Sequence, residues 1–194
     1  MWGVLCESYF QRFIRKDTTV LEVAAGQCEF INNIKAKRKI AVDINEDTLA
    51  WASPDVEVHV RPATDLSVIP SGTIDVTFIS NFLEHIPKDE IAATIRECHR
   101  VLRQGGQLII LQPNIRYCYK DYWMFYDHIT PLDDRALCEL IEVIGFSIVK
   151  SIPRFLPYTT KSRLPQWLFL IRLYLRCPFL WRLFGAQALV IARR

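Results

Sequence analysis

Two residues near the start of the chain have the types and the spacing of a nucleoside-binding site. Gly26 follows an apolar run that begins at Val20, and a glycine in a tight turn lets the backbone approach a ligand closely. Asp43 ends a second apolar run, seventeen residues after Gly26. A carboxylate at the tip of the second strand of a βαβ unit can accept hydrogen bonds from both hydroxyls of a ribose. The order of these residues therefore predicts nucleoside binding.

A sheet of parallel strands is the element that would position these residues. Apolar runs of strand length alternate with helix-like segments along the chain, a pattern typical of α/β folds whose sheet is covered on both faces. We expect strands near Thr19–Ala24, Lys39–Asp43, Val56–Val60, Asp75–Ile79, Gln107–Gln112, Phe146–Ser151 and Gln187–Ala192. Ligands bind such sheets at the carboxyl ends of the strands.

Three helices are expected, one before the first strand and two between later strands. They span Trp2–Arg15, Lys88–Arg103 and Asp133–Ile144. The second has the clearest pattern, because its apolar residues recur every three or four positions and form one buried stripe. We expect Gly105 and Gly145 to end the second and third helices in the left-handed conformation.

Further motifs resemble those of the class I S-adenosylmethionine (SAM)-dependent methyltransferases. Glu22–Cys28 is similar to the first motif of that family, Ala41–Ile44 to the second, and Thr64–Leu66 to the acidic element that faces adenine. Asp75–Ile86 resembles the fourth strand with the turn after it, and Val101–Leu108 the turn before the fifth strand. The resemblance covers about the first two thirds of the chain.

The resemblance implies a Rossmann-like, doubly wound sheet of seven strands, mostly parallel with an antiparallel last strand, and helices on both faces. It also implies SAM as cofactor. Glu22 would then bind the methionine amino group through the turn, Asp43 the ribose and Asp65 the adenine amine, while Ser80 and Asn81 would contact the methionine end. The predicted cofactor-binding residues are Glu22, Ala24, Gly26, Gln27, Asp43, Ile44, Thr64, Asp65, Leu66, Ser80, Asn81 and Phe82.

The first motif departs from the family pattern of three alternating glycines. Only Gly26 remains, and Ala24 and Cys28 occupy the other two positions. Each adds a side chain where the backbone should approach the cofactor closely. The substitutions leave open an alternative function, in which a non-catalytic module keeps the fold and binds a partner or a membrane surface.

His85 and His128 are the candidate catalytic residues. Methyl transfer moves a carbon from a sulfonium to a nucleophile in line with it, so positioning matters most and a base is needed only where the nucleophile must lose a proton. Both histidines lie on expected loops beyond strand ends, where a substrate would enter. A packing or capping role is the alternative for each.

Aromatic residues gather after the fifth expected strand, within ten positions of one another. They form either a hydrophobic subcore or a lid over the site. The polar stretch Gln112–Tyr117, which leaves the same strand, could line an acceptor pocket. The aromatic residues are Tyr117, Tyr119, Tyr122, Trp123, Phe125 and Tyr126.

The end of the chain is strongly basic. Val143–Arg194 contains nine Lys or Arg and no Asp or Glu, so this segment carries +9 and the rest of the chain −6. We expect a single methyltransferase-like domain over 1–194, with a basic apolar helical insertion at about 153–185. Arginines interrupt its apolar run before about 20 apolar residues accumulate, which argues against a transmembrane span. The insertion either packs at a sheet edge or dimer interface, or lies on an anionic membrane surface.

Composition excludes several other classes. The six cysteines form no CxxC pair and have no metal-ligand spacing with the four histidines, so we expect no metal site and no disulfide framework. Met1–Cys6 is too short for the apolar part of a signal peptide, which favours a cytoplasmic protein that associates with membranes if the insertion does. Nucleic acid is not an expected partner, because so much aliphatic surface has no role against phosphates.

The predicted function is transfer of a methyl group from SAM to a small-molecule or lipid-linked, amphiphilic acceptor. Whether oxygen, nitrogen or carbon is methylated is left open. A nicotinamide-dependent oxidoreductase shares the βαβ start but is not favoured, because Glu29 occupies the place of a glycine that its fingerprint requires.

Overall fold

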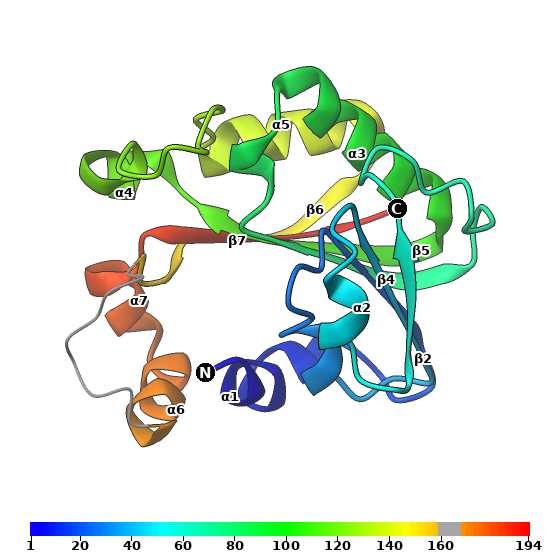
Figure 1. Cartoon of the computed structure of the whole chain (residues 1–194). Coiled ribbons are helices and arrows are strands. Elements are labelled where there is room, and N and C mark those ends of the chain that lie inside the picture. The colour runs from blue at the N-terminus through cyan, green and yellow to red at the C-terminus, as the bar shows by residue number, and fades with distance from the viewer. Residues whose placement is uncertain (159–167) are drawn as a thin grey trace.

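The protein folds into a seven-stranded sheet with helices on both faces (Figure 1). The structure is a computed structural model that describes residues 1–158 and 168–194. The strand order is β3-β2-β1-β4-β5-β7-β6. Strands β1 to β5 pair in parallel, and β7 is antiparallel to both β5 and β6. This confirms the predicted fold class. The strands are β1 (Thr19–Val23), β2 (Arg38–Asp43), β3 (Val56–Val60), β4 (Ile74–Ser80), β5 (Leu102–Pro113), β6 (Ser147–Leu156) and β7 (Gln187–Arg193).

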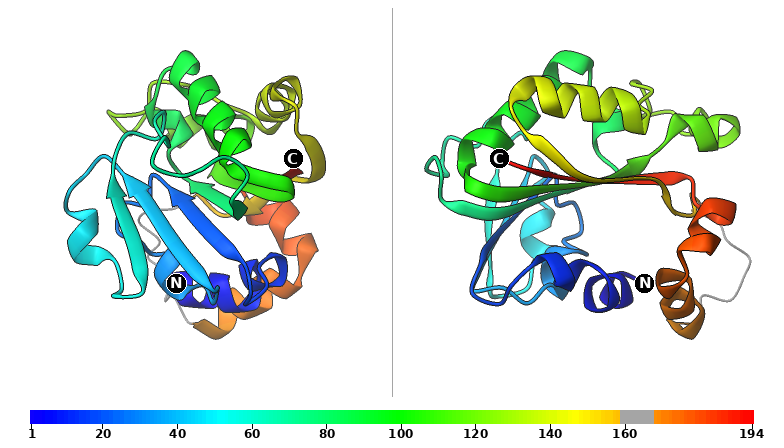
Figure 2. Two further views of the ribbon diagram at one scale, coloured as in Figure 1. Left: turned by 90° about the vertical axis from the view of Figure 1, so that its right-hand side faces the viewer. Right: turned by 180° about the vertical axis from the view of Figure 1, so that it is seen from behind.

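The helices form two layers. Helices α3 and α5 cover one face of the sheet, and α1, α6 and α7 lie on the other (Figure 2). The α-helices are α1 (Trp2–Ser8), α2 (Thr48–Trp51), α3 (Lys88–Val101), α4 (Ile115–Tyr122), α5 (Asp134–Ile144), α6 (Leu168–Arg176) and α7 (Pro178–Phe184). Three short 3₁₀ helices are η1 (Phe10–Phe13), η2 (Ile31–Asn33) and η3 (Leu83–His85).

Each face of the sheet packs against its own hydrophobic core. In β5, Ile109 and Leu111 belong to the core beneath α1, whereas Leu108 and Ile110 belong to the core beneath α3 and α5. Neighbouring residues of a strand point to opposite faces. Burial on both faces therefore explains why the central strands are continuous apolar runs rather than alternating ones.

The predicted helix Trp2–Arg15 is wrong in its second half. Helix α1 ends at Ser8, and after Tyr9 (φ −131°, ψ −59°) the chain continues as a 3₁₀ turn. Tyr9 and Phe10 are both buried, at 1% and 0% exposure. Neighbours on a continuous helix point about 100° apart, so the break allows both rings to enter the core.

The predicted end of the helix Lys88–Arg103 also needs correction. Helix α3 stops at Val101, because Leu102 is already extended (φ −65°, ψ 139°) and pairs with Ile74 of β4. Gly105 has a positive φ of 76° but lies in β5, not at the helix end. Gly145, in contrast, ends α5 in the left-handed conformation as predicted.

The connection between β6 and β7 begins and ends at one edge of the sheet. Leu156 and Pro113 both pair with Gln187, so α6 and α7 lie at the edge where the parallel strands have their carboxyl ends. These helices fall within the predicted insertion at about 153–185. The first residues of that predicted insertion, up to Leu156, belong to strand β6 instead. Residues 159–167 lie outside the described residues. Among the helices that are described, none is both long enough and apolar enough to span a membrane.

Candidate functional site

The turn after β1 has an unusual backbone. Ala24, Gly26 and Cys28 all have positive φ, at 56°, 49° and 58°, and these are the positions where the resemblance expects alternating glycines. For a residue with a side chain this conformation costs roughly 1–2 kcal/mol. The turn therefore keeps the shape that three glycines would allow. The Cys28 side chain is fully buried in the core, so it does not fill the space above the turn.

Asp43 joins this turn to the end of β2. Its Oδ2 accepts a hydrogen bond from the Gly26 backbone N–H (2.7 Å), and its Oδ1 accepts one from the Asn45 N–H (2.8 Å). Thr48 adds a second link, because its hydroxyl donates to the Gly26 carbonyl (2.9 Å). The two residues that the sequence singled out are thus in direct contact.

Glu22 lies beneath the turn, in the middle of the sheet. Its Oε2 accepts a hydrogen bond from the Ile31 N–H (2.9 Å), and its side chain is almost completely buried. Burial raises the pKa of Glu22 to about 8, the Ile31 N–H opposes this rise, and the negative charges of Glu29 and Asp43 add to it. Glu22 therefore supports the turn from below, and any effect on a ligand passes through the backbone.

A cleft of about 330 Å³ opens at the carboxyl ends of β1, β2, β3 and β4. Six of the predicted cofactor-binding residues line it: Ala24, Asp43, Ile44, Thr64, Asn81 and Phe82. Sequence reasoning missed four others, which are Pro62, Ala63, Ile86 and Glu90. Pro62 and Ala63 directly precede the predicted Thr64, so a wider window after β3 would have included them.

The other six predicted residues lie around the cleft without lining it. Gly26 and Gln27 are exposed on the turn, while Glu22 and Leu66 are buried. Ser80 ends β4, where it pairs with Leu111 of β5.

Asp65, the last of the six, is held by neighbouring groups. Its carboxylate accepts hydrogen bonds from the Ser67 N–H (3.0 Å) and the Arg61 guanidinium (2.9 Å). Hydrogen bonds from Ser67 and Arg61 hold the pKa of Asp65 below its usual range. The Asp65 carboxylate is thus already hydrogen-bonded to Ser67 and Arg61, next to the cleft.

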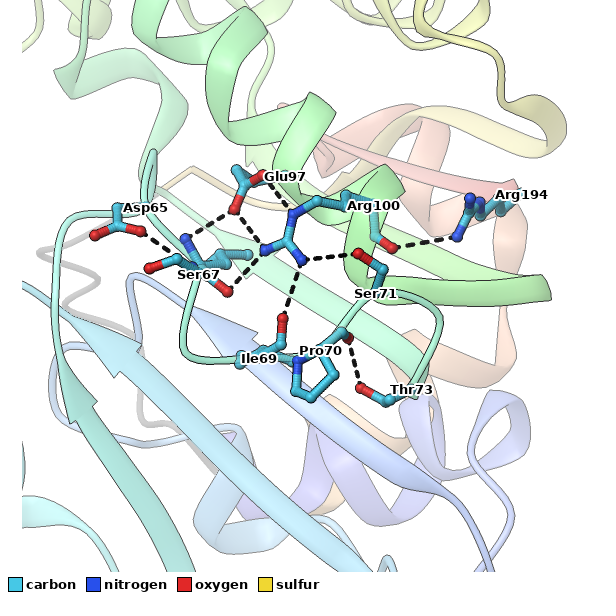
Figure 3. A network of polar contacts seen from close by, with 10 residues as sticks. Asp65, Ser67, Ile69, Pro70, Ser71, Thr73, Glu97, Arg100 and Arg194 are labelled. Carbon is cyan, nitrogen blue, oxygen red and sulfur yellow. Dashed lines mark hydrogen bonds and ion pairs between the residues drawn. The ribbon is translucent and has the colours of Figure 1, made fainter.

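Arg100 fastens the loop that carries Asp65 to helix α3 (Figure 3). Its guanidinium donates to the carboxylate of Glu97 (2.7 Å) and to the carbonyls of Leu66 (2.8 Å) and Ile69 (3.0 Å). Glu97 in turn accepts the Leu66 N–H at 2.9 Å. Leu66 is one of the predicted cofactor-binding residues. Its side chain is fully buried, and its backbone N–H and carbonyl anchor the loop to Glu97 and Arg100.

Asn81 leaves β4 in a left-handed conformation, with φ 45°. Its N–H donates to the Leu111 carbonyl at 2.9 Å, and asparagine tolerates this conformation better than most residues do. Ala24 and Asn81 thus end the neighbouring strands β1 and β4 with sharp bends. Both residues line the cleft between those strand ends.

The fold brings the two candidate histidines together, although they are far apart in the sequence. The rings of His85 and His128 are 4.9 Å apart between centroids. His128 is buried against Tyr122 and Phe125, and burial together with the nearby His85 lowers the pKa of His128. His85 lies in η3, three residues after Phe82, so both histidines lie near the cleft.

The aromatic residues after β5 divide between two environments. Tyr122 is fully buried, and its hydroxyl donates to the Thr130 carbonyl at 2.5 Å. Tyr119, Trp123 and Tyr126 are exposed. The cluster therefore forms neither a complete subcore nor a closed lid.

Comparisons with known proteins agree with this geometry. Residues 21–110 match the family described as "Methyltransferase domain". The chain is 29% identical over 165 residues to a protein of Mycolicibacterium smegmatis named "Probable S-adenosylmethionine-dependent methyltransferase", covering 79% of this chain and 62% of that protein. A Mycobacterium tuberculosis protein with the same description is 33% identical over 112 residues, covering 54% of this chain and 40% of the relative. The chain thus spans less than two thirds of the length of these relatives.

Solved structures support the fold. The crystal structure of a SAM-dependent methyltransferase from Archaeoglobus fulgidus superposes with a TM-score of 0.73 at 21% identity, over 99% of this chain and 92% of that one. The fold class predicted from the sequence is confirmed. The match over residues 21–110 and the names of the relatives agree with the predicted methyltransferase motifs and with SAM as the cofactor. Over residues 21–110 the chain is thus similar to methyltransferase domains, and its fold is that of a SAM-dependent methyltransferase of known structure.

Proposed function

We propose that the protein transfers the methyl group of SAM to an amphiphilic, lipid-linked acceptor at an anionic membrane surface. The choice of a lipid-linked acceptor at a membrane rests on the surface of α6 and α7. This surface is apolar and basic, and it lies at the same edge of the sheet as the cleft. A small soluble acceptor is the alternative, and the experiment below separates the two.

The order of the strands supports one orientation of SAM. Pro62–Thr64 follow β3, Asp43 and Ile44 end β2, and Asn81 follows β4. Adenine would then lie against the residues after β3, the ribose against Asp43, and the methionine end between Ala24 and Asn81. This places the reactive methyl group towards β4 and β5, where the acceptor must approach.

The residues of this chain would act mainly by positioning the two reactants. Bound SAM supplies an electrophilic methyl group on a sulfonium. The cleft would hold this group in line with the acceptor and exclude water, which is the largest available contribution for such a transfer. His128 and His85, which lie near the β4 end of the cleft, would accept a proton where the acceptor atom must lose one, as long as their ring nitrogens hold no other ligand.

Helices α6 and α7 carry exposed side chains that suit a membrane surface. Seven large apolar side chains on them are between 45% and 69% exposed: Leu168, Phe169, Leu170, Leu173, Phe179, Leu183 and Phe184. Arg176 and Arg182 are exposed on the same helices, and the pair between Arg172 and Glu7 (3.0 Å) is itself at the surface. A basic residue near anionic lipid adds about 1 kcal/mol of binding, and the apolar side chains would enter the interface.

Vesicle flotation tests the membrane step. The wild-type protein should float with vesicles that contain phosphatidylglycerol and remain unbound with neutral phosphatidylcholine vesicles, and raised salt should weaken the binding. Phe179→Ser combined with Phe184→Ser should abolish flotation. Val143→Ser, which changes an exposed apolar residue of α5, is the matched control and should float as the wild type does.

Radiolabelled SAM tests the acceptor class. Incubation of the protein with methyl-labelled SAM and a total lipid extract should transfer label into the organic phase. Label that enters only water-soluble compounds, together with failure to float at low salt, would replace the lipid-linked acceptor with a soluble one.

A further inference from the structure

Glu84, His85 and His128 form a cluster that the proposed methyl transfer does not fully explain. Each offers one ligand atom, and these atoms all lie within 4.8 Å of one another. Glu84 and His85 belong to η3, whereas His128 lies on the loop between α4 and α5. Because the fold joins these segments, the spacing in the sequence did not predict a metal site.

Two atoms of the cluster are buried without a partner. Glu84 is 2% exposed and His128 is 7% exposed. Within the described residues, neither Oε2 of Glu84 nor Nδ1 of His128 has a hydrogen-bond partner. Buried polar groups normally have one, so these two atoms indicate that a ligand belongs here.

We propose that Glu84, His85 and His128 bind a divalent transition-metal ion, with zinc as the best match. Two imidazole nitrogens and one carboxylate oxygen form a donor set that holds zinc in many proteins and leaves the fourth position open. The same set also suits iron(II). Magnesium and calcium prefer oxygen ligands alone, so they fit less well.

The observed geometry requires only small adjustments. Ligands about 2.1 Å from a tetrahedral zinc ion are about 3.4 Å apart, and Oε1 of Glu84 is 3.8 Å from Nε2 of His85. Rotation of the side chains would bring the donor atoms to coordinating distance. A bound cation would also satisfy the unpartnered carboxylate oxygen of Glu84.

Asp127 orients one of the ligands. Nδ1 of His85 is hydrogen-bonded to the main-chain carbonyl of Asp127 at 3.2 Å, and the Asp127 carboxylate Oδ2 is also 3.2 Å from Nδ1, which leaves Nε2 of that ring directed towards Glu84. Ligand histidines commonly donate their second N–H to a backbone carbonyl or a carboxylate in this way. Asp127 would also neutralise the positive charge that remains after one carboxylate binds a divalent ion.

The backbone holds the two halves of the cluster together. The N–H groups of Ile129 and Thr130 both donate to the Glu84 carbonyl, at 2.9 and 3.1 Å. The Thr130 hydroxyl donates to the Ile86 carbonyl at 2.7 Å. The loop that carries His128 is therefore fixed on η3, as a metal site requires of its ligands. An ion here would strengthen this attachment beside the cleft wall formed by Phe82 and Ile86.

Metal titration of the full chain tests the proposal without SAM or an acceptor. Protein stripped with a chelator should bind one equivalent of Zn²⁺ by calorimetry. Co²⁺ should give the visible absorption of a four- or five-coordinate nitrogen and oxygen site, without the near-ultraviolet band of thiolate ligation. Zn²⁺ binding and the Co²⁺ absorption do not depend on the proposed function, since a protein that binds no SAM would give the same results.

Variants assign the ligands. His128→Ala, Glu84→Gln and His85→Ala should each weaken Zn²⁺ binding by on the order of 100-fold or more. Asp127→Asn should weaken it less, because the main-chain carbonyl of residue 127 still orients His85. His59→Ala, which removes an imidazole on β3, is the matched control and should bind as the wild type does. His85→Ala, at a half-exposed position, serves if the buried variants do not fold. Failure of the wild type to bind Zn²⁺, a thiolate band with Co²⁺, or wild-type Zn²⁺ affinity in His85→Ala would overturn the proposal.

Discussion

The carboxylate of Asp43 accepts a hydrogen bond from the backbone N–H of Gly26 at 2.7 Å. This contact joins the end of β2 to the turn after β1. It sets the position of both elements before any ligand binds, which lowers the cost of ordering them in a complex. The contact between Gly26 and Asp43 therefore shapes the turn before the cofactor binds.

Ala24→Gly should make SAM binding tighter. Ala24 has a φ of 56° and lines the cleft, so glycine would relieve the left-handed strain and remove a methyl group from the binding surface. Relief of roughly 1–2 kcal/mol exceeds the 0.5–1 kcal/mol that glycine loses through greater freedom of the unfolded chain. Stability should therefore stay equal or rise slightly. Calorimetric titration with SAM and thermal denaturation measure the two effects, and weaker binding by the variant would contradict the expected close approach of the backbone.

Glu22→Gln should flatten the dependence of stability on pH. Burial raises the pKa of Glu22 from its ordinary value of 4.5 to about 8 in the folded chain, so the folded state holds this proton more tightly than the unfolded state does. The stabilisation that protonated Glu22 contributes is complete below about pH 4.5. It is lost as pH rises through about 8, at up to roughly 1.4 kcal/mol per pH unit.

Denaturation between pH 5 and about 8.5 compares the wild type with this variant. The wild type should lose more stability than Glu22→Gln across that range. Glu46→Gln removes an exposed carboxylate after β2 and serves as the control. Parallel pH profiles for the wild type and Glu22→Gln would show that Glu22 is ionised in the folded protein.

Arg100→Ala should loosen the loop between β3 and β4. The guanidinium joins Glu97, the Leu66 carbonyl and the Ile69 carbonyl, and loss of hydrogen bonds to a charged group costs about 1.5–3 kcal/mol. Hydrogen exchange should speed up over residues 65–73, and SAM affinity should fall because Thr64 precedes this loop. Arg96→Ala, at an exposed position of α3, is the control. Unchanged exchange in the loop would disprove the anchoring role of Arg100.

Local patterns in the sequence were sufficient to predict much of the fold and one side of the site. The apolar runs located the central strands because these are buried on both faces, and the turn from Glu22 to Cys28 could be recognised from contiguous residues. The break at Tyr9 could not be predicted, since it depends on how two neighbouring aromatic rings reach one core. Ile86 and Glu90 line the cleft only because β4 and α3 meet there, and the contact between Glu84 and His128 depends equally on tertiary packing.

The central claim is that the bend at Gly26 and the carboxylate of Asp43 together hold SAM, and calorimetric titration tests it most directly. The wild-type protein should bind one equivalent of SAM. Asp43→Ala should lose this binding while remaining folded, and Asp47→Ala, an exposed acid four residues further on, should keep it. Absence of SAM binding to the wild type, or an equal dissociation constant for Asp43→Ala, would contradict the account.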